Sequence, residues 1–161
     1  MMDYNTPQEV AENMMTTAIN KSKLSIKDLL IRGALSGALL AISVALALMA
    51  TTQTSLSLIG AFVFPVGFVI IVILGLELVT GSFSLVPLAW MEGKITGSKM
   101  LKNLTWVFIG NLLGSLLFAV LFWAASTDTG QIKELGLIEQ AMIKISEKKT
   151  IGYAGHGMLG L

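Results

Sequence analysis

Cysteine is absent from this chain of 161 residues, and histidine occurs once, as His156. Without cysteine there are no disulfides, thiolate metal sites, iron–sulfur clusters or cysteine nucleophiles. A single histidine argues against a histidine-rich metal site, and the sequence shows no paired carboxylates or nucleophile–base set. We therefore expect no enzyme, with no catalytic residues, no metal site and no cofactor.

Charged residues are also scarce, at 13% of the chain, whereas 54% of the residues are hydrophobic. A soluble domain has about 25% charged residues, and the mean hydropathy here is +0.77. The net charge of +1 leaves no cluster of Lys and Arg of the kind that follows a phosphate backbone. The lipid bilayer is therefore the expected partner, and nucleic acid is not.

The first 32 residues form a polar to mixed segment that begins with a helix signal. Thr6 is expected as the N-cap, Pro7 as the first helical residue and Glu9 as the third, which completes a capping box. Apolar residues recur at four-residue spacing after it, which indicates a short amphipathic helix. The segment contains acidic residues and lacks the basic region that precedes the apolar core of a signal peptide. A cleaved signal peptide therefore fits it less well than an amphipathic helix does. We expect a cytoplasmic amino-terminal segment over residues 1–32.

Three apolar segments fill the transmembrane region expected over residues 33–125. Residues 33–50 and 104–124 are uncharged and suit one span each. Residues 58–91 would form a helix of about 50 Å at 1.5 Å per residue, which exceeds a hydrocarbon core of about 30 Å. The second apolar segment must therefore break.

Residues that interrupt helices gather in the second half of this long segment: Glu77, Thr80, Gly81, Ser82, Ser84 and Pro87. We expect one half-helix to about residue 78, a non-helical loop at 80–84 and a second half-helix to residue 90. Irregular backbone at membrane depth is tolerated only where it faces protein or a wet cavity. The broken span thus indicates a pore or binding site.

The basic residues predict the orientation of the chain. They precede the first span and lie between the second and third spans: Lys21, Lys23, Lys27 and Arg32, then Lys94, Lys99 and Lys102. Both groups should be cytoplasmic, which predicts a multi-pass protein of the inner (plasma) membrane with a cytoplasmic amino terminus. Residues 126–150 are then an extracytoplasmic loop with a small amphipathic helix. Residues 151–161 read as the start of a fourth span, so we expect a truncated reading frame or an amino-terminal fragment.

Two motifs resemble the formate/nitrite transporter family. The sequence G-L-E-L-V-T-G at residues 75–81 is similar to the family pattern G-x-E-L-F-T-G-N, and a K-N pair at 102–103 precedes a G-N pair at 110–111. Val79 and Ser82 differ from the usual phenylalanine and asparagine. The resemblance implies an all-α polytopic membrane protein with three transmembrane spans here, the second interrupted at mid-membrane. These would form half of an inverted-repeat, six-span, aquaporin-like protomer that assembles as a homopentamer.

The family passes small monovalent anions such as formate or nitrite, with a proton as a further partner where transport is coupled. By this resemblance, Phe64 and Phe68 match a cytoplasmic-side constriction and Leu78 an outer-side one. Thr80 matches the loop threonine beside the central vestibule, and Lys149 matches an outer-vestibule lysine. His156 does not match the family's central histidine.

Each of these pathway positions also has a plainer structural interpretation. Phe64 and Phe68 are four residues apart and share a helical face, which suits a narrow lumen or an ordinary helix contact. Thr80 suits an anion hydrogen bond or a backbone cap. Glu77 is expected to accept hydrogen bonds from amides freed by the break, with a proton relay as the alternative.

The remaining positions are expected to structure the loop and the helix packing. Gly81 and Ser82 belong to the expected loop, and Asn111 is expected to bond carbonyl groups of the interrupted helix. Gly33-x-x-x-Gly37 and a matching pair at residues 110 and 114 are small-residue faces that let helices approach closely. The motifs do not name the partner helix.

Two functions of different class follow from these patterns. The first is a channel or transporter for small monovalent anions, present as its amino-terminal half. The alternative is a small three-span membrane subunit or assembly partner that transports nothing. The broken second span favours the first, because a scaffold has no need of a costly irregular segment at membrane depth.

Overall fold

The computed structural model describes residues 4–127 and 136–155, and every regular element in these ranges is an α-helix. The all-α prediction is therefore confirmed for the described chain. The helices are α1 (Pro7–Lys23), α2 (Ile26–Thr54), α3 (Ser57–Val63), α4 (Pro65–Ile73), α5 (Val79–Met91), α6 (Gly97–Ser126) and α7 (Leu137–Gly155).

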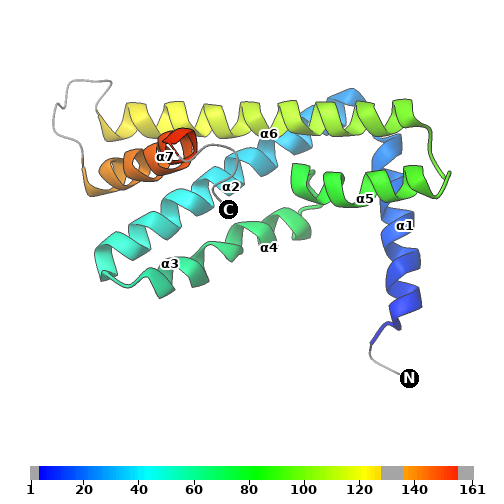
Figure 1. The fold of residues 1–161 in the computed structure, drawn as a ribbon, viewed down its shortest axis with the longest axis horizontal. Helices are drawn as coiled ribbons and strands as arrows, with labels where there is room; N and C mark the ends of the chain where they lie inside the picture. Colours follow the sequence, from blue (N-terminus) through cyan, green and yellow to red (C-terminus); the bar gives the residue numbers. More distant parts are fainter. Residues whose placement is uncertain (1–3, 128–135, 156–161) are drawn as a thin grey trace.

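Helix α1 begins with the predicted capping box. The Thr6 side chain accepts a hydrogen bond from the Glu9 amide at 3.3 Å, and the Thr6 amide donates to Glu9 Oε2 at 2.6 Å. Its far end carries Ala18 into a small core with Val86 and Ala89 of α5. The first helix is thus docked on the second half of the broken span, and its N-terminal turns stand free (Figure 1).

Helices α2 and α6 are the long apolar helices, and each is long and apolar enough to cross a membrane. They contain the predicted spans 33–50 and 104–124 and extend beyond both. The two helices cross (Figure 1), and glycines lie at their contact. A Cβ added to Gly37 would lie 2.1 Å from Asn111 O, and one added to Gly114 would lie 1.8 Å from Ala34 O. The two glycine pairs therefore pack against each other, backbone to backbone.

The second apolar segment breaks, although not where the sequence pattern indicated. The irregular backbone runs from Leu74 to Leu78, and residues 80–84 are helical within α5. Gly75, with φ of 62°, makes the turn that L-residues rarely adopt. Two of the hydroxyl groups that suggested a loop find acceptors while their residues are helical: Ser84 Oγ donates to Gly81 O at 2.9 Å, and Ser82 Oγ donates to the Glu77 carboxylate at 3.2 Å.

A second interruption lies earlier in this segment, at Pro65. Because proline has no amide hydrogen, α3 ends at Val63 and α4 begins with Pro65 at its first position. The predicted half-helix from residue 58 to about residue 78 is therefore two short helices, which end five residues earlier than expected. Both run back alongside α2, since Gly60 lies against Ala47 and Thr51.

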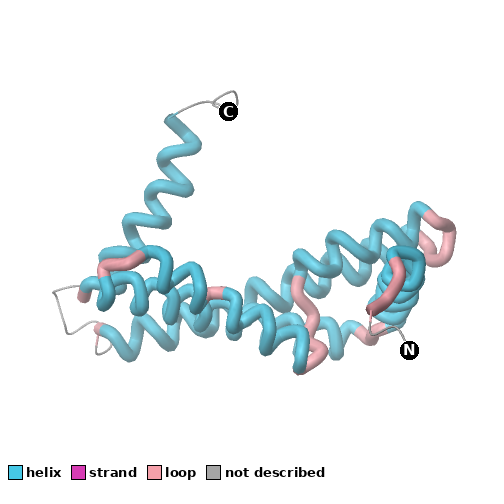
Figure 2. The backbone as a smooth tube through the Cα atoms, turned by 90° about the horizontal axis from the view of Figure 1, so that it is seen from below, coloured by secondary structure: helices cyan, strands magenta, loops and turns pink. Residues whose placement is uncertain are grey.

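Helix α7 runs without interruption through the predicted boundary at residues 150 and 151. It extends away from the other helices, as Figure 2 shows. The first residues of the predicted fourth span, 151–155, belong to this helix. The other residues of that predicted span, 156–161 with His156, lie outside the described residues.

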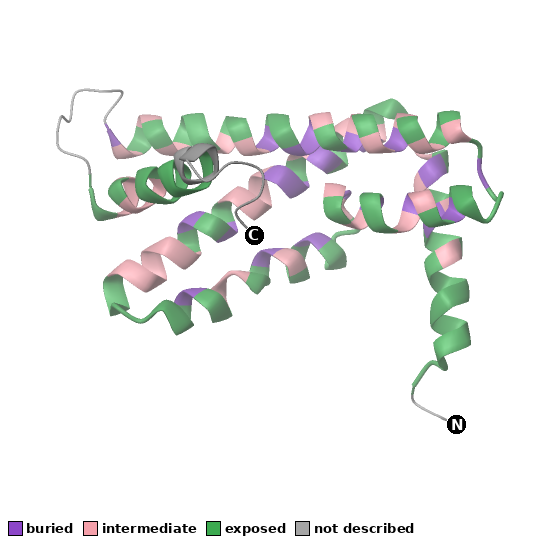
Figure 3. Ribbon diagram, in the orientation of Figure 1, coloured by how far each residue is buried: buried purple, intermediate pink, exposed green. Residues whose placement is uncertain are grey.

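Buried positions gather where α2 meets α6 and where α5 meets α1 (Figure 3). Large apolar side chains elsewhere are widely exposed: Phe62 is 74% exposed, Val72 77% and Leu117 61%. Exposed apolar surface of this extent, on helices of this length, is covered by lipid or by other protein. The fold is that of a membrane-embedded chain.

Candidate functional site

The break is held by side chains from both long helices. The Glu77 carbonyl accepts hydrogen bonds from Ser36 Oγ at 2.5 Å and from Asn111 Nδ2 at 2.9 Å. Asn111 Oδ1 in turn accepts from the Val79 amide at 3.0 Å. One asparagine of α6 thus binds the Glu77 carbonyl inside the break and the first amide of α5, groups that an unbroken helix would have satisfied by itself.

The Glu77 carboxylate is buried, with the residue 4% exposed, and it has two partners. Lys21 Nζ lies 2.8 Å from Oε2, and Ser82 Oγ donates to the same oxygen at 3.2 Å. The prediction that this carboxylate accepts from backbone amides of the break is wrong. The freed amide of Val79 bonds to Asn111 instead, and a lysine of α1 neutralises the carboxylate, as a buried charge requires.

A further buried asparagine holds α1 in place. Asn103 of α6 is fully buried, and its Nδ2 donates to the Lys21 carbonyl at 2.9 Å. The residue that pairs with Glu77 is therefore itself tied to α6 through its backbone. Helix α1, the break and α6 form one connected polar network through Lys21.

A pocket of about 580 Å³ lies against this network. Its lining comes from α1, α2, α4, the break and α5, and includes Phe68, Leu78, Thr80 and Gly81 from the predicted site, with Lys21, Arg32 and Glu77 beside them. In the described part of the chain, the amides of Thr80 and Gly81, in the first turn of α5, have no hydrogen-bond acceptor. Free amides at a helix start favour a negative ligand.

The charged residues of the lining are two cations and one carboxylate, which leaves one positive charge in excess. Lys21 is paired with Glu77. Arg32 donates from Nη1 to the Gly75 carbonyl at 3.4 Å, and it forms no ion pair with a carboxylate of the described chain. The pocket therefore combines a positive charge, a hydroxyl and free amides next to an apolar wall.

The two aromatic rings are in contact, with Phe64 and Phe68 centroids 5.3 Å apart in an edge-on arrangement of 76°. Phe68 lines the pocket, and Phe64 is not among its lining residues. Because α4 runs back along α2, Gly67 packs at Ser43, whereas Glu77 lies at Ser36, further toward the start of α2. The aromatic pair therefore lies nearer the carboxyl end of α2 than Leu78 does.

This order does not fit two of the predictions together: a cytoplasmic amino terminus and a ring pair on the cytoplasmic side. With a cytoplasmic amino terminus the carboxyl end of α2 lies outside, and the ring pair at residues 64 and 68 then lies nearer the outside than Leu78 does. The sequence pattern could not show this, because residue matches say nothing of which end of α2 each position faces.

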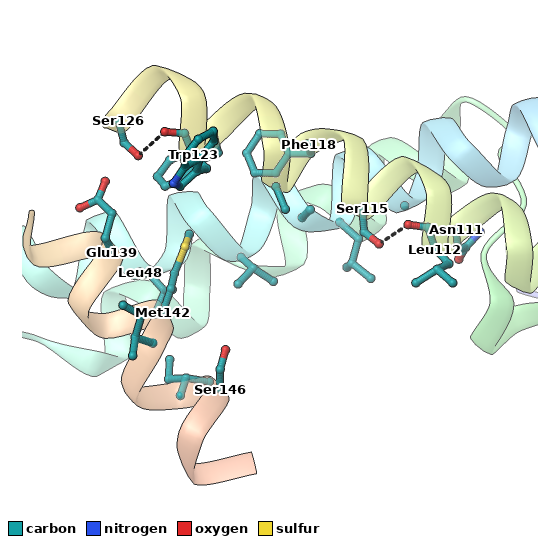
Figure 4. Close-up of a pocket in the computed structure, with 18 of the residues that line it drawn as sticks. Leu48, Asn111, Leu112, Ser115, Phe118, Trp123, Ser126, Glu139, Met142 and Ser146 are labelled. Carbon is teal, nitrogen blue, oxygen red and sulfur yellow. Dashed lines mark hydrogen bonds between the residues drawn. The ribbon is translucent and has the colours of Figure 1, made fainter. Parts of the chain in front are cut away.

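Lys149 lies apart from this pocket. It is exposed on α7 and does not line the pocket at the break. A second pocket, of about 680 Å³, lies between α2, α6 and α7, where Phe118 and Trp123 face Leu48 and Met142 (Figure 4). Its lining is largely apolar, and its charged residue is an acid, Glu139. No lysine or arginine is among its lining residues, so this second pocket offers an anion no positive charge.

Four residues of the site escaped the sequence reasoning: Lys21, Arg32, Ser36 and Asn103. Lys21 and Arg32 counted only toward membrane orientation, since positive charge before a span has that meaning by default. Ser36 stands between Gly33 and Gly37 in an apolar span, and a hydroxyl on a helix face that packs closely was the available signal. Asn103 belonged to the quoted K-N pair, with no indication of its partner.

Fold and site together define a membrane-embedded helical protein with a positively charged pocket at a broken span. A family model described as "Formate/nitrite transporter" matches residues 8–159. The chain belongs to this family.

Curated relatives agree with this assignment. The chain is 35% identical over 159 residues to the "Uncharacterized transporter YrhG" of Bacillus subtilis, which covers 93% of this chain and 60% of that protein. It is 33% identical to the "Formate channel FocA" of Haemophilus influenzae, over 82% of this chain and 48% of the channel. It is 28% identical to the "Formate channel BtFdhC" of Bacillus thuringiensis, over 75% and 49%. The chain thus spans about half the length of the curated relatives it matches. No solved structure matches it.

Proposed function

We propose that residues 1–161 supply one half of a pore for a small monovalent anion, with formate or nitrite as the substrate class. The observation that carries the proposal is the pocket at the break, where excess positive charge meets the free amides of α5. Relatives named as formate channels, about twice as long as their matched region, support both the substrate class and the half. The other half would be an inverted repeat of this one.

In this proposal the anion passes two constrictions and one polar binding position at Thr80. The rings of Phe64 and Phe68 form the outer constriction, which excludes hydrated ions and passes a small, partly dehydrated one. Leu78 forms the inner constriction. Thr80 lines the same pocket as the cations and the apolar residues. Its hydroxyl replaces part of the hydration that the anion loses.

Glu77 has a structural role in this pathway. Its carboxylate is engaged by Lys21 and Ser82, so it orders the break and adds no unpaired negative charge to repel an anion. A proton relay through Glu77 would have to break the ion pair in each cycle. Gly81, without a side chain, leaves the first turn of α5 open to the pocket.

The membrane setting and assembly belong to the same proposal. The basic residues before α2 and between α5 and α6 support a cytoplasmic amino terminus in the inner membrane. The broad exposed apolar surface supports burial against lipid and further protein, with a homopentamer as the proposed assembly.

The central test uses Thr80 in a full-length protein that contains residues 1–161, reconstituted in liposomes. Thr80→Val removes the hydroxyl at nearly constant volume and should slow formate uptake about tenfold, the loss expected for one hydrogen bond to a charged group. Thr80→Ser keeps the hydroxyl and should retain the wild-type rate. Equal rates for all three proteins would contradict the pathway, and folded wild-type protein without any anion flux would favour the non-transporting subunit.

Lys149 is proposed as a positive charge at the outer mouth that attracts anions through its electric field and does not contact them. Its field acts over a Debye length of about 8 Å at physiological salt. Lys149→Glu should therefore depress uptake most at low ionic strength and little at high. Thr80→Val should slow uptake at every salt concentration, because its site is screened less.

A further inference from the structure

Arg32 is the cation of the break pocket that forms no ion pair with a carboxylate of the described chain. Lys21 is held by Glu77 at 2.8 Å. Arg32 contacts a neutral group, the Gly75 carbonyl, through Nη1 at 3.4 Å. Asp28 lies one turn before Arg32 on α2, near enough for the two charges to attract each other. Its carboxylate accepts from Ser25 Oγ at 2.6 Å, and it forms no ion pair with the arginine.

The position of Arg32 makes its guanidinium available to a ligand. Arg32 is exposed, and it lines the pocket together with Phe68, Thr80 and Gly81. A single bond to Gly75 occupies one nitrogen of the guanidinium, which has five donors in a planar fork. The remaining donors are free to bind within the pocket.

We propose that Arg32 is a specificity-determining residue that selects anions with two oxygen atoms in one plane. A guanidinium binds such a group through two parallel hydrogen bonds, whereas a monatomic anion accepts only a point contact. Formate and nitrite have the favoured shape, and chloride does not. This inference rests on the proposed function and adds to it the residue that separates anion shapes.

A purely structural role of Arg32 predicts a different result for the Arg32→Lys variant. If the arginine only caps the Gly75 carbonyl, a lysine at the same position keeps both the charge and a donor to that carbonyl. Protein stability and total flux can then change, but the preference for one anion shape over another stays the same. The ratio of formate to chloride flux is therefore the readout that separates the two roles.

The experiment compares Arg32→Lys and Arg32→Gln with wild type in full-length protein that contains residues 1–161. Flux of formate and of chloride is measured into liposomes at matched gradients. Arg32→Lys should lower the formate-to-chloride ratio about tenfold, since one of two charged hydrogen bonds is lost. Arg32→Gln should also lower the flux of both anions. Lys27→Gln removes an exposed charge of the same helix outside the pocket lining, and it should leave the ratio unchanged.

A competition assay on the wild-type protein tests the same idea without any variant. Formate uptake should be inhibited by nitrite at concentrations where chloride has no effect. Equal inhibition by both, or an unchanged flux ratio in folded Arg32→Lys, overturns the role of Arg32 while the pore remains. A folded wild-type protein that passes neither formate nor nitrite overturns the proposed function itself.

Discussion

The crossing of α2 and α6 lies beside the break between α4 and α5, and each region is stabilised by a different kind of interaction. At the crossing, Gly37 and Gly114 bring backbone against backbone. At the break, polar side chains of both long helices bind the freed groups of residues 77 and 79. Asn111 belongs to both regions, because its backbone faces Gly37 and its side chain binds the break.

The difference follows from the solvent. Between apolar helices lipid offers no hydrophobic driving force, so close contact and van der Waals packing hold them together, which small residues permit. An irregular backbone has the opposite need, since an unpaired amide or carbonyl costs several kcal/mol in an apolar medium. Shape therefore governs one region and hydrogen bonding the other.

The largest expected effect is at the crossing. Gly114→Ala places a methyl group 1.8 Å from the Ala34 carbonyl oxygen, and backbone cannot rotate out of the way, so it should destabilise the protein by about 4 kcal/mol. Gly81→Ala is the matched control, since nothing lies within 4 Å of its added Cβ. Thermal unfolding in detergent compares the two. Equal midpoints would show that the helices do not meet as described.

A somewhat smaller loss is expected at the break when its buried charge is removed. Glu77→Ala leaves Lys21 without its partner and should cost about 3 kcal/mol, toward the low end for a buried pair because the lysine retains some access to water. A closed cycle uses Lys21→Met, Glu77→Gln and the double variant of these two changes, and the double variant should lose less than the sum of the two single losses. Unfolding midpoints of the single and double variants measure the coupling, and strictly additive losses would contradict the ion pair.

Asn111 tests whether the two regions are separable. Asn111→Ala keeps the backbone at the crossing but leaves the Val79 amide and part of the Glu77 carbonyl's bonding unmet, with an expected cost of about 2 kcal/mol. Hydrogen exchange should locate the change: faster exchange at the start of α5, with the middle of α2 unchanged. Faster exchange along α2 as well would show that the break and the crossing form one unit.

The smallest effect is expected at the exposed start of α1, where neither close backbone packing nor buried hydrogen bonds stabilise the chain. The hydrogen bond from the Thr6 amide, and then that from its hydroxyl, lower the pKa of Glu9 below its ordinary 4.5. The capping contribution is therefore complete above the ordinary value and is lost as the pH falls through the lowered one. The protection of the amides at residues 8–10, taken relative to their intrinsic exchange rate at each pH, should fall only in that acidic range, and Glu9→Gln should remove this pH dependence.

The sequence patterns predicted much of this architecture. The capping box needs only residues three apart, and the long apolar helices need only uninterrupted apolar composition, so both followed from local chemistry. The need for a break followed from length alone. Its place did not, because Thr80 to Ser84 are tolerated inside a helix once Ser82 and Ser84 find acceptors, and Gly75 supplies the turn.

What the sequence by itself determined is therefore the membrane as surroundings, the helices that fill it and the presence of one interruption, since hydropathy and bilayer thickness act on each segment separately. Only the tertiary structure decided which side chains meet at the interruption. Lys21, Arg32 and Asn111 come from three helices, and Lys21 lies 56 positions from the glutamate it neutralises. Such pairings depend on how the helices cross, and no local pattern records the crossing.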